Sequence, residues 1–321
     1  TRKITAIVLD KTGTITEGKP EVVESVGLDD VEVASVLFAI ETRSEHPLAE
    51  AVVRYLQPRT SHITAHTSHF DSQTGKGVKA TVDGTTWLVG NRRLLEENGI
   101  SIGAEYRDKE KTWQEHAHTV VWVADAKEVR AAIAIADRIK PSAAEAIARL
   151  KASGIQVYMQ TGDSRRTAQA VAKAVGIDDF RSEVLPRDKA TFVVGLQQMG
   201  HVVAMVGQGI NDCEALAKAD VSIAMGHGSD IAMDVARITL ISTDLNAVPR
   251  AIVLSRKTVS FIRQNLFWAF IYNVLGIPIA AGVLYPVNGF LLDPMIAGAA
   301  MALSSVSVVS NSLRLKAVRL N

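Results

Sequence analysis

The chain has 321 residues, 47% of them hydrophobic, and its 35 Lys and Arg are balanced by 34 Asp and Glu. This is enough apolar material for several packed cores, which excludes an intrinsically disordered chain. The balanced charge gives no electrostatic reason to expect a nucleic-acid partner, and none is predicted. The single cysteine, Cys213, excludes an internal disulfide framework and any CxxC metal site.

The first predicted element is a buried parallel strand at residues 5–9, an apolar run that ends in Asp10. From residue 137 onward, helical and strand patterns alternate, which is typical of a doubly wound α/β domain. In chain order the expected elements are helix 144–152, strand 155–159, helices 165–175 and 190–199, strand 202–206 and helix 212–219. Ligands bind beyond the carboxyl ends of such strands, so we expect the functional residues there.

Residues 21–136 have a different texture, rich in Val and Thr and alternating between apolar and polar side chains. The expected elements are helices 31–39 and 49–56 and strands within 78–89 and 119–123. We interpret this segment as an inserted α+β domain, since a structureless loop of that length is uncommon. The α/β domain would then be discontinuous and comprise residues 1–20 and 137–250.

The C-terminal region 251–321 is predicted to enter a membrane. Residues 264–292 and 294–313 contain no ionisable side chain, so each can supply the ~20 apolar residues that cross a bilayer. We expect a two-helix transmembrane hairpin with spans near 264–284 and 294–313. Basic residues flank the pair on both outer ends, which predicts a multi-pass protein with its α/β and α+β domains in the cytoplasm. The alternative is a buried helical hairpin in a soluble protein.

Four polar motifs stand at predicted strand-to-loop junctions or helix starts. They are Asp10-Lys11-Thr12-Gly13-Thr14, Thr161-Gly162-Asp163, Lys189 in Leu185-Pro186-Arg187-Asp188-Lys189, and Gly207-Gln208-Gly209-Ile210-Asn211-Asp212. A carboxylate at a strand end can attack phosphorus, and a hydroxyl and amides at a helix start can bind phosphoryl oxygens. A lysine can neutralise the developing charge, and a further carboxylate can support a metal.

This order of motifs resembles the phosphorylation domain of P-type ATPases, which has a haloacid-dehalogenase-like fold, from about residue 4 to the C-terminus. The resemblance implies these candidate catalytic residues: Asp10, Lys11, Thr12, Thr161, Gly162, Asp163, Lys189, Asn211 and Asp212. Asp10 would become a covalent aspartyl-phosphate, and Thr161 and Lys189 would hold the phosphoryl group. Phosphatases of this superfamily carry a second Asp two positions after the nucleophile, where this chain has Thr12, so the intermediate should hydrolyse slowly.

The predicted insert contains no GxxxxGK[ST] loop, so nucleotide must be held in another way. Its motifs Ser44-Glu45-His46-Pro47, Gly75-Lys76-Gly77 and Gly90-Asn91 resemble the nucleotide-binding domain of heavy-metal P-type ATPases. The resemblance implies that ATP is bound by Glu45, His46, Gly75, Gly77, Gly90 and Asn91. Without the other motifs, a lone SEHP would be interpreted as a helix-capping turn.

The two C-terminal spans contain Tyr272-Asn273 and Met301 with Ser304-Ser305, and no carboxylate. A thioether is a soft ligand suited to Cu(I), and the pattern is similar to the copper/silver branch of these pumps. The resemblance implies that Cu⁺ or Ag⁺ is transported through Tyr272, Asn273, Met301 and Ser305. Membrane lipid and a metallochaperone would then be partners. The alternative for these side chains is helix packing.

The resemblance places Mg²⁺ against Asp10, Thr12, Gln208 and Asp212, but Gln208 stands where the family has a metal-binding Asp. The chain also begins just before the Asp10 motif, so we expect a catalytic and C-terminal portion without the upstream Cys-Pro-Cys and TGE loops. Three functions stay open: ATP-driven transport of Cu(I) or Ag(I), a catalytically silent nucleotide-binding module, and a soluble haloacid-dehalogenase-type phosphatase.

Overall fold

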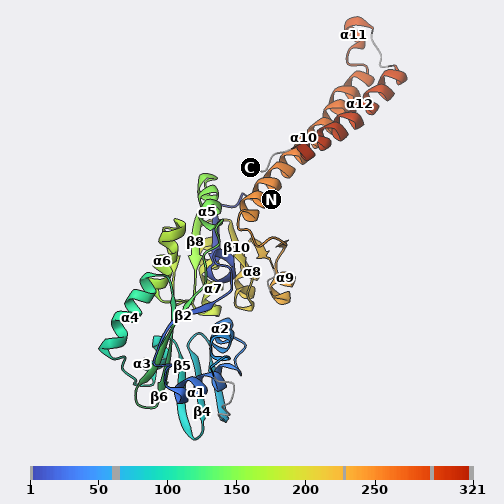
Figure 1. The fold of residues 1–321 in the computed structure, drawn as a ribbon. Coiled ribbons are helices and arrows are strands. Elements are labelled where there is room, and N and C mark those ends of the chain that lie inside the picture. The colour runs from blue at the N-terminus through green and yellow to red at the C-terminus, as the bar shows by residue number, and fades with distance from the viewer. Residues whose placement is uncertain (1–2, 60–65, 227–228, 290–292, 318–321) are drawn as a thin grey trace. The chain divides into compact units, whose positions relative to one another are not determined.

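The computed structural model describes residues 3–59, 66–226, 229–289 and 293–317 (Figure 1), which divide into two compact units between Ala247 and Val248. The strands are β1 (Ala6–Asp10), β2 (Glu21–Val26), β3 (Thr67–Gln73), β4 (Gly77–Val82), β5 (Thr85–Gly90), β6 (Thr119–Asp125), β7 (Val129–Ala136), β8 (Gln156–Gln160), β9 (Asp179–Arg181), β10 (Val203–Gly207), β11 (Val221–Met225) and β12 (Ile238–Leu240). The helices are α1 (Val31–Glu41), α2 (Pro47–Leu56), α3 (Arg92–Glu97), α4 (Ala104–Glu115), α5 (Ala143–Ala152), α6 (Arg165–Val175), α7 (Pro186–Gln198), α8 (Cys213–Lys218), α9 (Asp230–Val235), α10 (Ala247–Ala280), α11 (Tyr285–Asn288) and α12 (Pro294–Leu313).

The first sheet is parallel throughout, in the order β12-β11-β10-β1-β8-β9. Every residue of β1 is buried, as expected for a central strand that is covered on both faces. Helices α7, α8 and α9 bury apolar side chains against β1 and β10, while α5 contacts β8 (Figure 1). Asp10 therefore emerges in the middle of the sheet's carboxyl edge, with Gln160 of β8 beside it in register.

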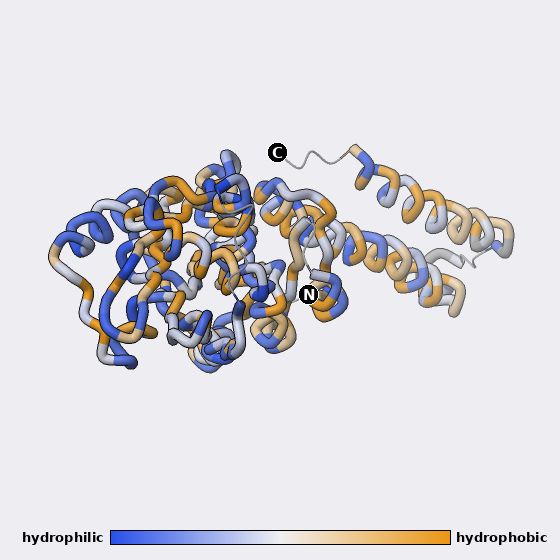
Figure 2. Tube along the Cα trace, turned by 60° about the horizontal axis from the view of Figure 1, so that its bottom comes forward, coloured by the Kyte–Doolittle hydropathy of each residue, from blue (hydrophilic) through white to orange (hydrophobic). Residues whose placement is uncertain are grey.

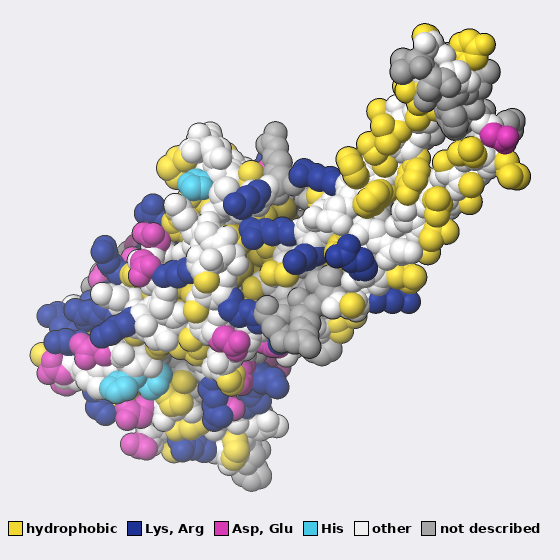
Figure 3. Space-filling model, turned by 90° about the horizontal axis from the view of Figure 1, so that it is seen from above, with side chains coloured by type: hydrophobic (Ala, Val, Ile, Leu, Met, Phe, Trp, Pro, Cys, Tyr) yellow, Lys and Arg dark blue, Asp and Glu magenta, His cyan; other side chains and the backbone are white. Residues whose placement is uncertain are grey.

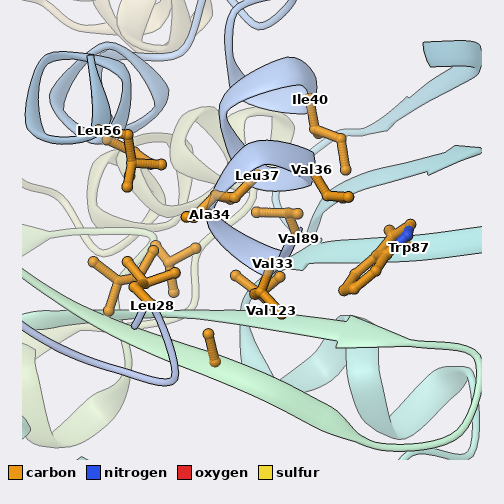
Figure 4. Close-up of a cluster of buried hydrophobic side chains, with 14 of the residues drawn as sticks. Leu28, Val33, Ala34, Val36, Leu37, Ile40, Leu56, Trp87, Val89 and Val123 are labelled. Carbon is orange, nitrogen blue, oxygen red and sulfur yellow. The ribbon is translucent and has the colours of Figure 1, made fainter. Parts of the chain in front are cut away.

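The second sheet is antiparallel throughout, in the order β2-β7-β6-β5-β4-β3. All of its strands come from residues 21–136, which are called the insert below. Helices α1 and α2 pack their apolar side chains, including Leu37 and Leu56, against Val89 and Val123 on one face (Figure 4). Helices α3 and α4 cover the other face around Trp122. The insert thus has its own core, which agrees with the predicted α+β texture.

The predicted C-terminal spans fall on α10 and α12, which contact each other through polar side chains. Asn265 donates to Ser312 Oγ at 2.8 Å and accepts from Asn311 Nδ2 at 2.8 Å. Farther along, Tyr272 and Ser307 share a hydrogen bond of 3.2 Å. Figure 2 shows that hydrophobic residues are frequent along the two helices, and many of their large apolar side chains are exposed (Figure 3).

The structure does not confirm the predicted transmembrane hairpin. Among the described residues, no helix combines the length and apolar character that crossing a membrane requires. Serine and asparagine recur along α12, and α10 carries basic residues through its first half.

Candidate active site

Three charged side chains meet at the carboxyl edge of the parallel sheet. Lys189 donates to Asp10 Oδ1 at 2.6 Å and to Asp212 Oδ1 at 2.7 Å. All three are buried, with exposed fractions of 5% for Asp10, 6% for Lys189 and 1% for Asp212. The helix that carries Lys189 begins at Pro186, earlier than the predicted start at residue 190, so the lysine lies in its first turn. One ammonium group thus bridges two carboxylates from different strand ends.

Burial controls the ionisation of this triad. It is the largest influence on Asp10 and raises the pKa of that carboxyl to about 6, against the attraction of Lys189. Burial also disfavours the charged form of Lys189, but the Asp10 and Asp212 carboxylates raise the pKa of the ammonium above its ordinary value. Lys189 is therefore charged at neutral pH, while Asp10 changes its charge near pH 6.

A second ion pair joins Lys11, which directly follows Asp10, to Asp163 in the loop after β8. Lys11 Nζ is 2.5 Å from Asp163 Oδ2, which also accepts from the Thr161 hydroxyl at 3.0 Å. Asp163 Oδ1 accepts from Thr119 of the insert at 2.9 Å. Although burial alone would raise it, the charge of Lys11 holds the pKa of Asp163 below its ordinary range. The Thr161 hydroxyl, with Gly162 next to it, is thus oriented by a carboxylate that stays ionised.

The turn after Asp10 is irregular. Gly13 has φ +74°, a left-handed conformation that glycine adopts without strain, and its amide donates to the Thr16 hydroxyl at 3.0 Å. Lys140 donates to the Gly13 carbonyl at 2.6 Å. The Thr12 side chain is exposed. These contacts hold the backbone of the turn while leaving position 12 open at the surface.

A group of contacts, called the clasp below, joins the two crossings between the sheet and the insert. Asp137 accepts from the Thr16 hydroxyl at 2.5 Å and from the Gly18 amide at 3.0 Å. Thr16 also forms an isolated β-bridge with Ile139. The predicted sites contained neither Asp137 nor Lys140. A possible signal was an acid placed directly after a strand and shortly before Pro141.

The last predicted motif places Asp212 and Gln208 on the other side of Asp10. Asp212 Oδ2 accepts from the backbone amides of Gln208 at 3.2 Å and Gly209 at 3.1 Å. The Gln208 carboxamide lies against Gly13, because a Cβ added to that glycine would be 1.5 Å from Gln208 Nε2. Asn211 is exposed in the same short turn. The other three motifs therefore lie at the same edge of the sheet as the motif that begins with Asp10.

In the insert, the predicted nucleotide-binding glycines lie at one end of β4 and β5, with Gly75 in the turn before β4. Gly77 and Gly90 are paired in register, and a Cβ on either would come within 2.2 Å of a carbonyl oxygen on the facing strand. Asn91 caps α3 and donates to the Gly75 carbonyl at 2.8 Å. The close approach of the two strands is thus a structural reason for Gly77 and Gly90. Their predicted contact with ATP stays a prediction.

Glu45 and His46 lie on another element, at the start of α2. His46 Nδ1 accepts from the Leu48 amide at 3.2 Å, so its proton resides on Nε2. Burial lowers the pKa of His46, against the attraction of Asp163, and the ring is neutral. Glu45 is exposed. The imidazole can therefore offer one N–H donor at neutral pH.

Two further buried polar residues, Glu41 and Gln160, were also missed by the sequence analysis. Glu41, in the last turn of α1, is buried among apolar side chains, which raises its pKa to about 7. Gln160, fully buried at the end of β8 beside Asp10, has no hydrogen-bond partner for either amide atom in the described structure. An acid on an apolar helix face five residues before His46 was the available signal for Glu41.

Among the described residues, no hydrogen bond between α10 and α12 joins two of the four predicted copper ligands. Tyr272 bonds Ser307 instead. Asn273 donates to a carbonyl of its own helix at 3.1 Å, and Ser305 donates to the Met301 carbonyl at 3.4 Å. The Met301 side chain is exposed. No group of three or more His, Cys, Asp or Glu side chains suited to a metal ion occurs in the described part of the chain.

The fold and the site define the class of protein. Residues 4–220 match the haloacid dehalogenase-like hydrolase family, which covers more than half of the chain and includes β1, β8 and β10 with their loops. The chain belongs to this family. The predicted α/β fold of the residues around Asp10 is thereby confirmed.

Within the family, the chain is similar to copper-transporting P-type ATPases. It is 50% identical over 317 residues to the probable copper-transporting ATPase PacS of Synechococcus elongatus, covering 98% of this chain and 42% of that protein. It is 47% identical over 320 residues to the copper-exporting P-type ATPase of Legionella pneumophila, covering 99% and 43%. These matches confirm the resemblance to the copper branch, and the chain spans less than half the length of both relatives.

Two solved structures share the fold. A zinc-transporting PIB-type ATPase in the E2.Pi state is 32% identical, with a TM-score of 0.64, and the match covers 98% of this chain and 50% of that one. The catalytic domain of the CPx-ATPase CopB-B is 29% identical, with a TM-score of 0.65, and the match covers 78% of this chain and 89% of that one. Both are structures of ATPases.

Proposed function

We propose that the chain is the catalytic and C-terminal portion of an ATP-driven pump for Cu(I) or Ag(I) that works through an aspartyl-phosphate on Asp10. One observation carries this function: the buried Asp10, Lys189 and Asp212 triad in the middle of the sheet's carboxyl edge. The copper-transporting ATPases to which the chain is similar support the choice of nucleotide and ion.

In the proposed reaction, an ionised Asp10 oxygen attacks the γ-phosphorus of ATP. The bond between that phosphorus and the bridging oxygen breaks, ADP leaves with the electron pair, and an acyl phosphate forms on Asp10. Lys189 and the Thr161 hydroxyl would stabilise charge on the transferred group. Thr12 offers no carboxylic acid to activate water, so the acyl phosphate should persist, which a pump requires and a phosphatase does not.

We further propose that the insert binds the nucleoside part of ATP. His46 would donate from Nε2, and Glu41, near half protonation at neutral pH, would offer either a donor or an acceptor to the base. The hairpin that carries Gly75 would provide backbone amides. Because the insert has its own core, it can hold nucleotide whatever the state of Asp10.

For the C-terminal helices we propose a membrane setting inside a complete pump. Their large exposed apolar side chains, such as Phe267 and Met295, would be covered by lipid or by other spans of the pump. Tyr272, Asn273, Met301 and Ser305 would contact Cu⁺ or Ag⁺ delivered by a metallochaperone. The two catalytic sheets would then lie in the cytoplasm.

The proposed reaction is tested by labelling with γ-labelled ATP. We expect acid-stable label that hydroxylamine removes, and loss of at least 100-fold of it in Asp10→Asn, since the nucleophile is gone. Asp108→Asn, an exposed position on α4, is the matched control and should label normally. Because the signal of the unmodified chain can be weak, the comparison is repeated with Gln208→Asp added to the unmodified chain, to Asp10→Asn and to Asp108→Asn. Label that survives Asp10→Asn would refute the reaction, and rapid release of free phosphate would favour the phosphatase alternative.

A further inference from the structure

Gln208 occupies a position at which its side chain touches the loop of the proposed nucleophile. It follows β10 and is half-buried. Its carboxamide lies close to two glycines of this loop. A Cβ added to Gly13 would be 1.5 Å from Gln208 Nε2, and a Cβ added to Gly18 would be 3.1 Å from the same atom. The side chain at position 208 is therefore a direct neighbour of the backbone that follows Asp10.

The fold family implies a divalent cation at this centre, but the residues present do not fit a tightly held one. Mg²⁺ prefers charged oxygen ligands. Lys189 occupies one oxygen of Asp10 and one of Asp212, and the second oxygen of Asp212 accepts two backbone amides. Among the carboxylate oxygens of the triad, this leaves only the second oxygen of Asp10 without a hydrogen bond in the described structure.

The charge at the centre leads to the same conclusion. Asp10 and Asp212 carry two negative charges when ionised, and Lys189 cancels one of them. The neighbouring pair of Lys11 and Asp163 is neutral overall. Gln208 adds an amide oxygen but no charge, and the structure has no cluster of three acidic, His or Cys side chains among its described residues. A dication at this centre therefore meets a net charge of about −1. A carboxylate at position 208 would make that net charge about −2.

We infer that Gln208 is a specificity-determining residue that keeps the divalent-cation affinity of the Asp10 centre low, so that nucleotide binding in the insert is uncoupled from phosphoryl transfer at ordinary Mg²⁺ concentrations. The consequence for phosphoryl transfer rests on the proposed function, whereas the cation affinity does not. A carboxylate in place of the carboxamide should raise that affinity tenfold to 100-fold, equivalent to about 1.4 to 2.8 kcal/mol.

The test is a titration of the full chain with Mn²⁺, followed by electron paramagnetic resonance of the free ion. Gln208→Asp should bind one Mn²⁺ tenfold to 100-fold more tightly than the unmodified chain. Gln198→Asp, which adds the same charge at an exposed position of α7, should bind as the unmodified chain does. Gln208→Asp combined with Asp10→Asn should lose the gain, which locates the ion at the centre. Superimposable curves for Gln208→Asp and the unmodified chain would overturn the inference.

Two further measurements separate this inference from the proposed function. A fluorescent ATP analogue in EDTA should bind equally to the unmodified chain and Gln208→Asp, since the insert is unchanged, and urea unfolding verifies that both are folded. If Gln208→Asp gains Mn²⁺ affinity but forms no phosphoenzyme, the inference stands and the proposed reaction fails. If the unmodified chain forms phosphoenzyme at the same Mg²⁺ midpoint as Gln208→Asp, the inference fails and the proposed reaction stands.

Discussion

The parallel sheet and the insert hold their candidate functional residues in different ways. Around Asp10, the side chains are charged, buried and joined by ion pairs from separate strand ends. In the insert, the candidate nucleotide residues are mostly glycines, a cap and a neutral imidazole, and burial raises the pKa of the acid Glu41. The first arrangement holds charged groups in fixed positions. The second offers backbone groups and neutral side chains to a ligand.

The largest expected effect comes from breaking the ion network. Lys189→Met leaves two carboxylates buried without their cation, and we expect a loss of about 3–5 kcal/mol in the free energy of unfolding at pH 7.5. The loss should shrink toward pH 5, where Asp10 can take up a proton. Urea unfolding followed by circular dichroism measures it, because both sheets contribute to that signal.

Its control is Lys218→Met, an exposed lysine on α8, which should stay within about 0.5 kcal/mol of the unmodified chain. Trp87, Trp113 and Trp122 all lie in the insert, so tryptophan fluorescence follows mainly that region. We expect nucleotide affinity to be unchanged under native conditions. A loss below about 1 kcal/mol for Lys189→Met would show that the triad contributes little to stability.

A smaller effect, in pH dependence, tests the insert's buried acid. The pKa of Glu41 is about 7 in the folded chain, against 4.5 as its ordinary value, so the folded state binds the proton more tightly. The contribution of Glu41 to stability is therefore fully present below pH 4.5 and is lost as the pH rises through 7, by about 3 kcal/mol for a fully realised shift. Glu41→Gln should remove this fall. Tryptophan-monitored urea unfolding between pH 5 and 8 measures it.

Asp10, whose pKa is also raised, makes a further contribution to stability that is lost as the pH rises, at lower pH than that of Glu41. The comparison must therefore be made against the unmodified chain at each pH. The matched control is Glu45→Gln, an exposed position at which the slope should be unchanged. Parallel stability curves for Glu41→Gln and the unmodified chain would mean that Glu41 finds a hydrogen-bond partner as it ionises.

The smallest expected effect concerns Gln160, which resembles neither region because it is buried and neutral, yet unpaired. Replacing an unsatisfied buried carboxamide with an apolar side chain of similar volume removes a desolvation penalty of about 1–3 kcal/mol. We expect Gln160→Leu to raise the free energy of unfolding by about 1 kcal/mol, measured by thermal and urea unfolding. Gln198→Leu is the exposed control. Destabilisation by Gln160→Leu would indicate that the amide is bonded in solution, for example through water.

Much of the parallel sheet could be predicted from local sequence. Apolar runs and helical periodicity placed β1 and α6, and the rule that ligands bind at carboxyl strand ends gathered the Asp10, Thr161 and Asp212 motifs in one region. Helix α4 was not predicted, because its sequence is polar and buries few side chains, so no apolar periodicity marks it.

The remaining contacts depend on residues that are distant in the chain. Asp137 meets Thr16 across 121 positions, and Gln160 lies beside Asp10 only because β8 pairs with β1. Burial of Glu41 depends on the whole insert core. For the C-terminal helices, spacing on one helix placed Met301 near Ser305 in sequence, but the partner of Tyr272 is Ser307, which depends on how the two helices are aligned.

The clasp holds the two ends of the insert next to each other. Thr16 and Ile139 pair as neighbours, and Lys140 donates its amide to the Ile15 carbonyl at 2.9 Å. The two ends of the insert are therefore held together where they leave the parallel sheet, as the two strands of a hairpin are. This holds whatever the length of the insert. Because closing a loop becomes only slowly less favourable as the loop grows, residues can be gained or lost at the far end of the insert with little effect on the sheet. Proteins built this way can change the residues at the far end of such a segment while the geometry around the carboxylate at the strand end, here Asp10, is retained.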